Sequence, residues 1–158
     1  MSLSVLESAR FKRSRLAIAL LGASGAAAVL LASAAAATSP TTRACPSASV
    51  VNAALGLHGG APVSTATPYS KTCTYPGKGT IYSTKITFQM DTAATFAASE
   101  KAAAAALRGS VVKVQHLGQA AWGTDPGSLY VFDGHETIKI LALLTPTAKL
   151  EVLARKLL

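Results

Sequence analysis

The feature that most constrains the fold is the pair Cys45 and Cys73, the only two cysteines of the 158-residue chain. They bracket a short segment that has apolar residues at helical spacing and ends at Gly56. A disulfide would tie this helix to the strands that follow and close a loop of about 29 residues, worth about 3 to 4 kcal/mol by chain entropy. A reactive or metal-bound thiol is the alternative, but neither cysteine lies in a C-x-x-C or Cys/His spacing. The sequence therefore predicts one structural disulfide.

The first quarter of the chain has the layout of a secretory signal. Basic residues cluster between Arg10 and Arg15, an uncharged run covers residues 16–37, and A-x-A sites lie at 32–34 and 35–37. About 22 apolar residues could also span a bilayer, so an uncleaved anchor is the alternative. The run is mostly Ala, Gly and Ser rather than Leu and Ile, which favours cleavage.

Three segments follow from this layout: residues 1–37 as a signal peptide or N-terminal membrane anchor, 38–44 as a polar linker, and 45–158 as one exported domain. We expect the domain to be secreted if the signal is cleaved, and anchored in the plasma membrane if it is not. In both cases the basic N-terminus stays inside and the domain lies outside the cytoplasm.

The charge of the chain indicates which kinds of partner it could bind. The chain has 15 basic and 7 acidic residues, and four of the basic residues and one acidic residue precede the cleavage region, which leaves about +5 on the exported part. The basic residues are scattered singly and do not alternate with aromatics, so we expect no nucleic-acid partner. An envelope protein or an anionic envelope component, such as a wall polymer or a lipid surface, is the expected partner.

The exported part alternates short strands and helices. The strict alternation over residues 82–90 predicts a strand with one packed and one wet face, as in antiparallel sheets. Turn residues and apolar spacing then predict helices up to Gly56, over 92–108 and after a cap at Thr145, and strands at 63–67, 71–75, 82–90, 111–117, 129–132 and 137–143. The last helix is expected to have an inner stripe of Leu150, Leu153, Ala154 and Leu157. The expected fold is α+β in the order αβββαβββα, with the helices packed on one face of a mainly antiparallel sheet.

Several short motifs occur in a recognisable order: Cys45 before the first helix, Cys73-Thr74-Tyr75, His116-Leu117-Gly118-Gln119-Ala120-Ala121-Trp122, and Leu129-Tyr130-Val131. This order resembles small exported proteins and lipoproteins of actinobacteria grouped as domains of unknown function. Those show a C-x-[YW] strand and a G-L-G-x-x-A segment. Here His116 stands where the family usually has Gly, Gln119 where an acid is common, and there is no lipobox cysteine. The resemblance implies an extracytoplasmic α+β domain, similar in layout to the sensor domains of some bacterial receptor kinases, and no catalytic residue.

No catalytic constellation stands out. Asp91 or Thr92 is expected to cap a helix, Asp125 and Asp133 to lie in turns, and Glu136 beside a hairpin. G-x-S-x-G, H-E-x-x-H and P-loop motifs are missing from the sequence. We therefore expect no enzymatic activity, no cofactor and no metal site.

None of the three histidines is expected to bind a metal. His58 and His135 lie in glycine loops and are expected to be solvated. His116 shares a predicted strand face with Val112 and Val114, which favours a half-buried, hydrogen-bonded side chain over a metal ligand.

Trp122 is the only tryptophan and lies in a segment, residues 118–126, that reads as a loop between strands. One interpretation is a core anchor beneath the loop, and the other is an exposed anchor for recognition. Tyr75 and Tyr82 could extend such a patch. The candidate binding residues are Trp122, Gln119, Tyr75 and His116.

The prediction for function is a non-enzymatic exported binding or accessory domain, sensor-like, at the cell envelope. A small secreted hydrolase and a secreted enzyme inhibitor are the alternatives. A deep polar pocket that joins His116 to an acid would favour the hydrolase.

Overall fold

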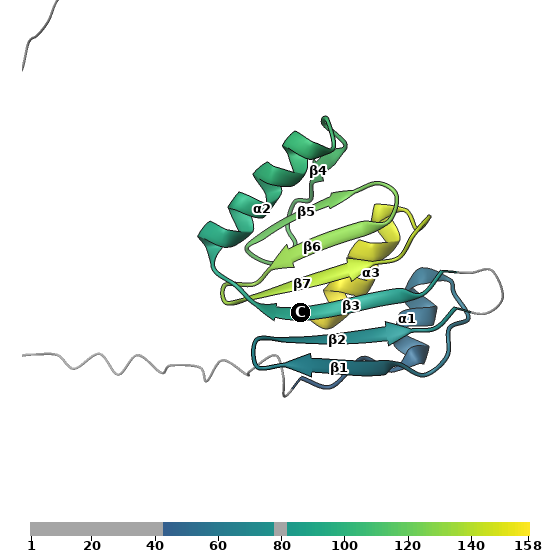
Figure 1. Ribbon diagram of the computed structural model, residues 1–158. Coiled ribbons are helices and arrows are strands. Elements are labelled where there is room, and N and C mark those ends of the chain that lie inside the picture. The colour runs from purple at the N-terminus through teal and green to yellow at the C-terminus, as the bar shows by residue number, and fades with distance from the viewer. Residues whose placement is uncertain (1–42, 78–81) are drawn as a thin grey trace, which may run out of the picture. The chain divides into compact units, whose positions relative to one another are not determined.

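The computed structural model describes residues 43–77 and 82–158, so the expected signal peptide and most of the linker lie outside the described residues. The described residues form three helices and one seven-stranded sheet, arranged as in Figure 1. The elements are α1 (Ala48–Leu55), β1 (Val63–Thr67), β2 (Ser70–Tyr75), β3 (Thr84–Met90), α2 (Ala93–Ala106), β4 (Val111–Lys113), β5 (Ala120–Thr124), β6 (Ser128–Phe132), β7 (Glu136–Leu141) and α3 (Thr147–Leu157). The predicted α+β class is confirmed, with one strand more than expected.

The sheet has the order β1-β2-β3-β7-β6-β5-β4, and every neighbouring pair is antiparallel. At its centre β3 pairs with β7, which places Ile86 opposite Ile140 and Phe88 opposite Ile138. All four side chains are fully buried and lie on the same face of the sheet. This face carries the main core.

Helices α1 and α3 cover this face, which we call the covered face; in Figure 1 they lie behind the sheet. The predicted inner stripe of α3 is confirmed, because Leu150, Leu153, Ala154 and Leu157 are all buried. Helix α1 buries Val51 and Leu55, and Gly56 ends it in a left-handed conformation at φ 70°, which glycine adopts without strain.

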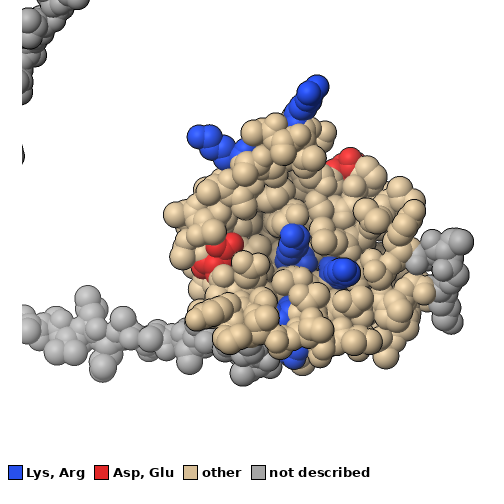
Figure 2. All heavy atoms as spheres, viewed as in Figure 1, with Lys and Arg blue, Asp and Glu red and all other residues tan. Residues whose placement is uncertain are grey.

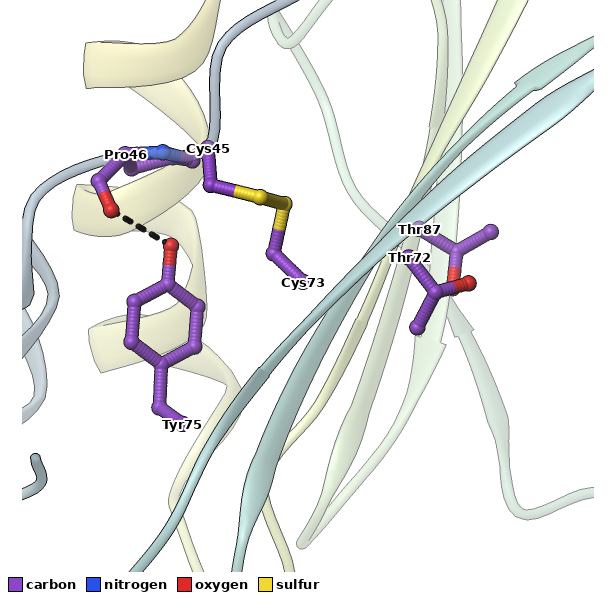
Figure 3. The surroundings of a disulfide bond; sticks show 6 residues. All are labelled: Cys45, Pro46, Thr72, Cys73, Tyr75 and Thr87. Atoms are coloured by element: carbon purple, nitrogen blue, oxygen red, sulfur yellow. Dashed lines mark hydrogen bonds between the residues drawn. A yellow bond between two sulfur atoms is a disulfide. The ribbon is translucent and has the colours of Figure 1, made fainter. Parts of the chain in front are cut away.

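The disulfide joins Cys45 to Cys73 with a Cα–Cα distance of 5.7 Å, as the sequence predicts. Figure 3 shows it beside Tyr75, whose hydroxyl donates a hydrogen bond of 2.7 Å to the Pro46 carbonyl. Burial raises the pKa of Tyr75 to about 12. Both contacts fix the segment before α1 onto strand β2, from the covered side of the sheet.

Replacement of Cys73 by alanine is expected to lower the free energy of unfolding by about 2 to 5 kcal/mol. The bridge closes a separation of 28 residues, and Cys73 is 0% exposed in the core, so the variant loses both the cross-link and packed volume. Urea unfolding measures the loss. Cys45→Ala, whose side chain is only partly buried, should lose the cross-link with less packing. Two titratable thiols in the native protein before reduction would contradict the bridge.

One strand was missed, and another is shorter than expected. The predicted strand 111–117 ends at Lys113, and β5 lies where the sequence reads as a loop. Gly123 misled the prediction, because glycine inside a strand usually signals a break. Here a Cβ atom at Gly123 would lie 2.5 Å from the Ser128 carbonyl oxygen, so glycine is needed for the close approach of β5 and β6.

Helix α2 does not join α1 and α3, which corrects the expectation that all helices pack on one face. Its Phe96 packs against Trp122 and Phe132, whose side chains point away from the covered face. Thr92 caps the helix as expected, with its hydroxyl accepting from the Thr95 amide at 3.2 Å. Because α2 is mostly alanine and buries only Phe96, its sequence holds little information about which face it covers.

Helix α3 begins at Thr147, so the predicted cap at Thr145 is wrong. Its first turn is capped instead by Asp125, from the turn between β5 and β6. One carboxylate oxygen of Asp125 accepts hydrogen bonds from the Thr147 amide at 3.0 Å and from the Thr147 hydroxyl at 3.3 Å. The capping partner lies 22 residues away in sequence, beyond the reach of local capping patterns.

Candidate functional site

The sheet face opposite α1 and α3 is covered by α2 only near β4, β5 and β6. The remainder, which we call the open face, presents hydroxyls, two ammonium groups and a few apolar groups. The strand register places its members in neighbouring rows: Thr72, Thr74, Lys85, Thr87, Lys139, Leu141. In Figure 3, Thr72 and Thr87 point away from the disulfide, and their hydroxyls are 3.0 Å apart.

Lys85 and Lys139 carry the charge of the open face. Lys139 lies opposite Thr87 and Lys85 lies opposite Leu141, so the two lysines are diagonal neighbours, with Cα atoms about 7 to 8 Å apart in such a register. Within residues 43–77 and 82–158, neither lysine forms a salt bridge. Figure 2 shows basic side chains near the middle of this view, while acidic side chains lie towards its edges. The open face is therefore locally cationic.

Aromatic side chains continue the face from Lys139 towards α2. The Lys139 ammonium nitrogen lies 5.0 Å from the centroid of the Tyr130 ring, a cation–π contact. Tyr130 in turn stacks on Trp122 with a centroid distance of 3.9 Å. The half-buried Lys139 is thus held in place by an aromatic ring rather than by a carboxylate.

A pocket of about 340 Å³ lies at the end of the open face where β3 begins and β7 ends. Its lining includes Tyr82, Lys85, Ser128, Leu141 and Leu143. The volume falls at the lower end of the range found for small-molecule sites. Tyr82 is 56% exposed and Leu143 60% exposed, so two large apolar side chains border this hollow without being covered.

A smaller hollow of about 170 Å³ brings together two residues that the sequence singles out, His116 and Gln119. His116 is exposed in a bend after β4, with φ 58°, so the prediction of a half-buried histidine on a strand face is wrong. Its carbonyl oxygen accepts a 3.0 Å hydrogen bond from Arg155. Gln119 is also exposed, and its side-chain amide covers Gly134 in the β6–β7 hairpin.

The other two predicted site residues are buried. Trp122 is 3% exposed and lies in strand β5, so the interpretation as a core residue is confirmed and that of an exposed anchor on a loop is wrong. Tyr75 is 2% exposed on the covered face, on the other side of the sheet from Trp122. The four residues therefore do not form one site.

Sequence reasoning missed Lys85, Lys139 and Leu143 as site residues. The alternation over 82–90 placed Lys85 on a wet face, which was the available signal. That Lys139 and Leu143 join it depends on the pairing of β3 with β7, two strands separated by the whole of α2, β4, β5 and β6.

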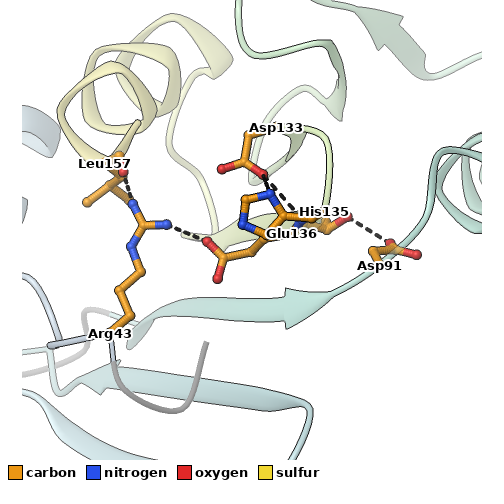
Figure 4. A network of polar contacts seen from close by, with 7 residues as sticks. Arg43, Asp91, Asp133, His135, Glu136 and Leu157 are labelled. Carbon is orange, nitrogen blue, oxygen red and sulfur yellow. Dashed lines mark hydrogen bonds and ion pairs between the residues drawn. The ribbon is translucent and has the colours of Figure 1, made fainter. Parts of the chain in front are cut away.

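An ionic network lies at the other end of the domain (Figure 4). Arg43 donates hydrogen bonds to the Glu136 carboxylate and to the Leu157 carbonyl at the end of α3, and its guanidinium lies 4.6 Å from the centroid of the Phe88 ring. Burial raises the pKa of Glu136, while the Arg43 guanidinium opposes this shift. The network ties Arg43, two residues before Cys45, to the C-terminus of α3.

Among the residues that the structure describes, His, Cys, Asp and Glu form no group of three or more that could hold a metal ion. The described helices include none that is long and apolar enough to cross a bilayer.

Comparison of the chain with protein-family models, curated proteins and solved structures finds no match in any of the three. The resemblance to small exported actinobacterial proteins therefore stays a prediction.

Proposed function

We propose that the chain is an exported, non-enzymatic binding domain of the cell envelope that holds an anionic envelope component on its open face. The observation that carries this proposal is the pair Lys85 and Lys139, neighbours on an uncovered sheet face without a salt bridge among the described residues. Cations without a carboxylate partner, on a face of hydroxyl groups, favour a ligand that supplies both negative charge and hydrogen-bond acceptors.

The structural disulfide is compatible with an oxidising, extracytoplasmic compartment, which supports the export part of the proposal. The basic N-terminal region and the apolar run that follows supply the second argument. Both observations support an extracytoplasmic location, where wall polymers and anionic lipids would be available to the open face.

The hydrolase alternative has weaker support. Glu100 and His116 line the same small hollow, but Glu100 pairs with Lys113 at 3.3 Å. Within residues 43–77 and 82–158, no hydrogen bond joins Glu100 to the His116 imidazole. General acid–base catalysis needs an oriented pair with its proton-transfer geometry in place, so this hollow favours hydrolysis less than the open face favours binding.

The double variant Lys85→Glu/Lys139→Glu is expected to weaken binding to immobilised poly(glycerol phosphate) by about tenfold or more, because each reversal removes an attraction and adds a repulsion. Surface plasmon resonance at two salt concentrations measures the change. Lys101→Glu/Lys156→Glu is the matched control, since both lysines are exposed on α2 and α3 and the net charge changes equally. An equal loss in the two double variants would show attraction by net charge alone and overturn the open face as the site.

A further inference from the structure

We infer that the 340 Å³ pocket at the end of the open face takes a small amphiphilic anion, whose apolar part contacts Tyr82, Leu141 and Leu143 and whose acidic group pairs with Lys85. This inference rests on the proposed function, because it uses Lys85 of the same cationic face and adds a smaller anion that binds at the end of that face. The occupant is a soluble molecule with one acidic head and a short chain, rather than a lipid in a bilayer.

The charge of the lining favours an acid. Lys85 is the only charged residue among the described residues that line the pocket, and its ammonium group has no carboxylate partner within salt-bridge distance in the described part of the chain. A ligand carboxylate or phosphate would supply the missing partner.

The apolar residues favour a hydrocarbon chain. Tyr82 and Leu143 are more than half exposed and Leu141 is half-buried, so three apolar side chains line one hollow. Apolar side chains gathered at a concave site gain from being covered by ligand, whereas a polar anion alone would leave them in water. The volume limits the chain to a short one.

The walls of the pocket are held by backbone hydrogen bonds, so the site is formed before a ligand binds. The Ala142 amide donates to the Gly127 carbonyl at 2.9 Å, and the Gly127 amide donates to the Thr145 carbonyl at 3.0 Å. These bonds join the segment that carries Leu143 to the β5–β6 turn. Asp125 fastens the same turn to the first turn of α3.

The polar part of the lining is also ordered. Ser128 is buried, and its hydroxyl lies 2.6 Å from the Thr124 hydroxyl across the β5–β6 hairpin. A ligand therefore meets a fixed pair of hydroxyls, apolar side chains and one cation, Lys85. This arrangement orients an amphiphile with its acidic end towards Lys85.

Isothermal titration of the full chain with octanoate tests the inference, with acetate as the anion without a chain and octanamide as the chain without a charge. Saturable octanoate binding, at least tenfold tighter than that of acetate or octanamide, is the expected result. Tyr82→Ala and Leu143→Ala should each weaken octanoate binding about tenfold. Lys85→Gln should reduce octanoate binding to the level of octanamide and leave octanamide binding unchanged.

Matched controls come from exposed residues of the same type outside the pocket lining. Leu144 and Tyr69 are 74% and 69% exposed and do not line the pocket, so Leu144→Ala and Tyr69→Ala should bind octanoate like the wild type. Equal effects of the pocket and control variants would overturn the inference. So would co-sedimentation with phosphatidylglycerol vesicles combined with no saturable binding of free octanoate.

The two proposals fail separately. Retention on poly(glycerol phosphate) that depends on Lys85 and Lys139, without octanoate binding, would overturn the pocket inference and leave the open face as a polymer site. Octanoate binding without polymer retention would overturn the polymer-binding role and support the pocket as a small-molecule site.

Discussion

Replacement of Trp122 by alanine is expected to lower the free energy of unfolding by about 3 to 5 kcal/mol. Trp122 is 3% exposed, and its ring stacks on Tyr130 at 3.9 Å and contacts Phe96 at 6.3 Å between centroids. Phe96 is the only buried residue of α2, so the cavity would also loosen the contact of this helix with the sheet. Urea unfolding followed by far-ultraviolet circular dichroism measures the loss.

The variant Trp122→Phe separates packing from polarity. In the described residues the Trp122 indole N–H has no hydrogen-bond partner, and a buried unpaired donor costs about 1 to 3 kcal/mol. Phenylalanine keeps an aromatic ring against Tyr130 and removes the unpaired donor. We therefore expect Trp122→Phe to lower the free energy of unfolding by less than about 1 kcal/mol. A loss for Trp122→Ala no larger than that for Trp122→Phe would contradict the role of the indole ring as a core element.

The local sequence pattern was sufficient to predict which residues of a single helix or strand are buried. Alternation over residues 82–90 identified the buried face of β3, and helical spacing identified the inner residues of α3. The cysteine pair predicted the disulfide because the chain has no other cysteine with which either could pair.

Prediction failed where the deciding contact is distant in sequence. Gly123 reads as a break, but its role depends on the Ser128 carbonyl of the next strand. Asp125 reads as a turn residue, yet it caps a helix that begins at Thr147. His116 was placed on a strand face, but β4 ends at Lys113 and the histidine lies in an exposed bend. For Gly123 and Asp125, the local sequence does not show the distant residue that decides their role. For His116, it does not show where the strand ends.

The candidate site shows the same limit. The wet face of β3 could be predicted, and with it Lys85. The neighbours that make this lysine part of a site come from β7 and the segment after it, and the pairing of β3 with β7 requires the knowledge that α2 crosses to the far edge of the sheet. Trp122 drew attention because it is the only tryptophan, but a lone large aromatic is more useful in a core, and here it fills one.

Arg43 illustrates a contact that no pattern signals. It falls in the expected linker, but its guanidinium binds Glu136, 93 residues later in sequence. The Glu136 side chain is 3% exposed, whereas that of Arg43 is 30% exposed. Removal of the arginine would leave a buried carboxylate without its counter-charge, which is the costly way to break such a pair.

We expect Arg43→Ala to lower the free energy of unfolding by about 3 kcal/mol or more at pH 7. Burial already raises the pKa of Glu136. The folded state therefore binds the carboxyl proton of Glu136 more tightly than the unfolded chain does. A raised acid pKa means that stability falls as the pH rises above the ordinary value of 4.5 and is regained below it. Loss of the arginine raises this pKa further, so the deficit of the variant should be small near pH 4 and grow towards neutral pH.

Unfolding curves of wild type and variant between pH 4 and pH 8 measure this dependence. Arg155→Ala is the matched control, because Arg155 also donates to a backbone carbonyl, at 3.0 Å, but is exposed at the surface. Its replacement should change stability by less than about 0.5 kcal/mol. In Arg43→Ala/Glu136→Gln the buried charge is gone, and the pH dependence should disappear with it. A deficit of Arg43→Ala that is constant across this range would show that the arginine acts through its contacts with Phe88 and Leu157 rather than by balancing the charge of Glu136.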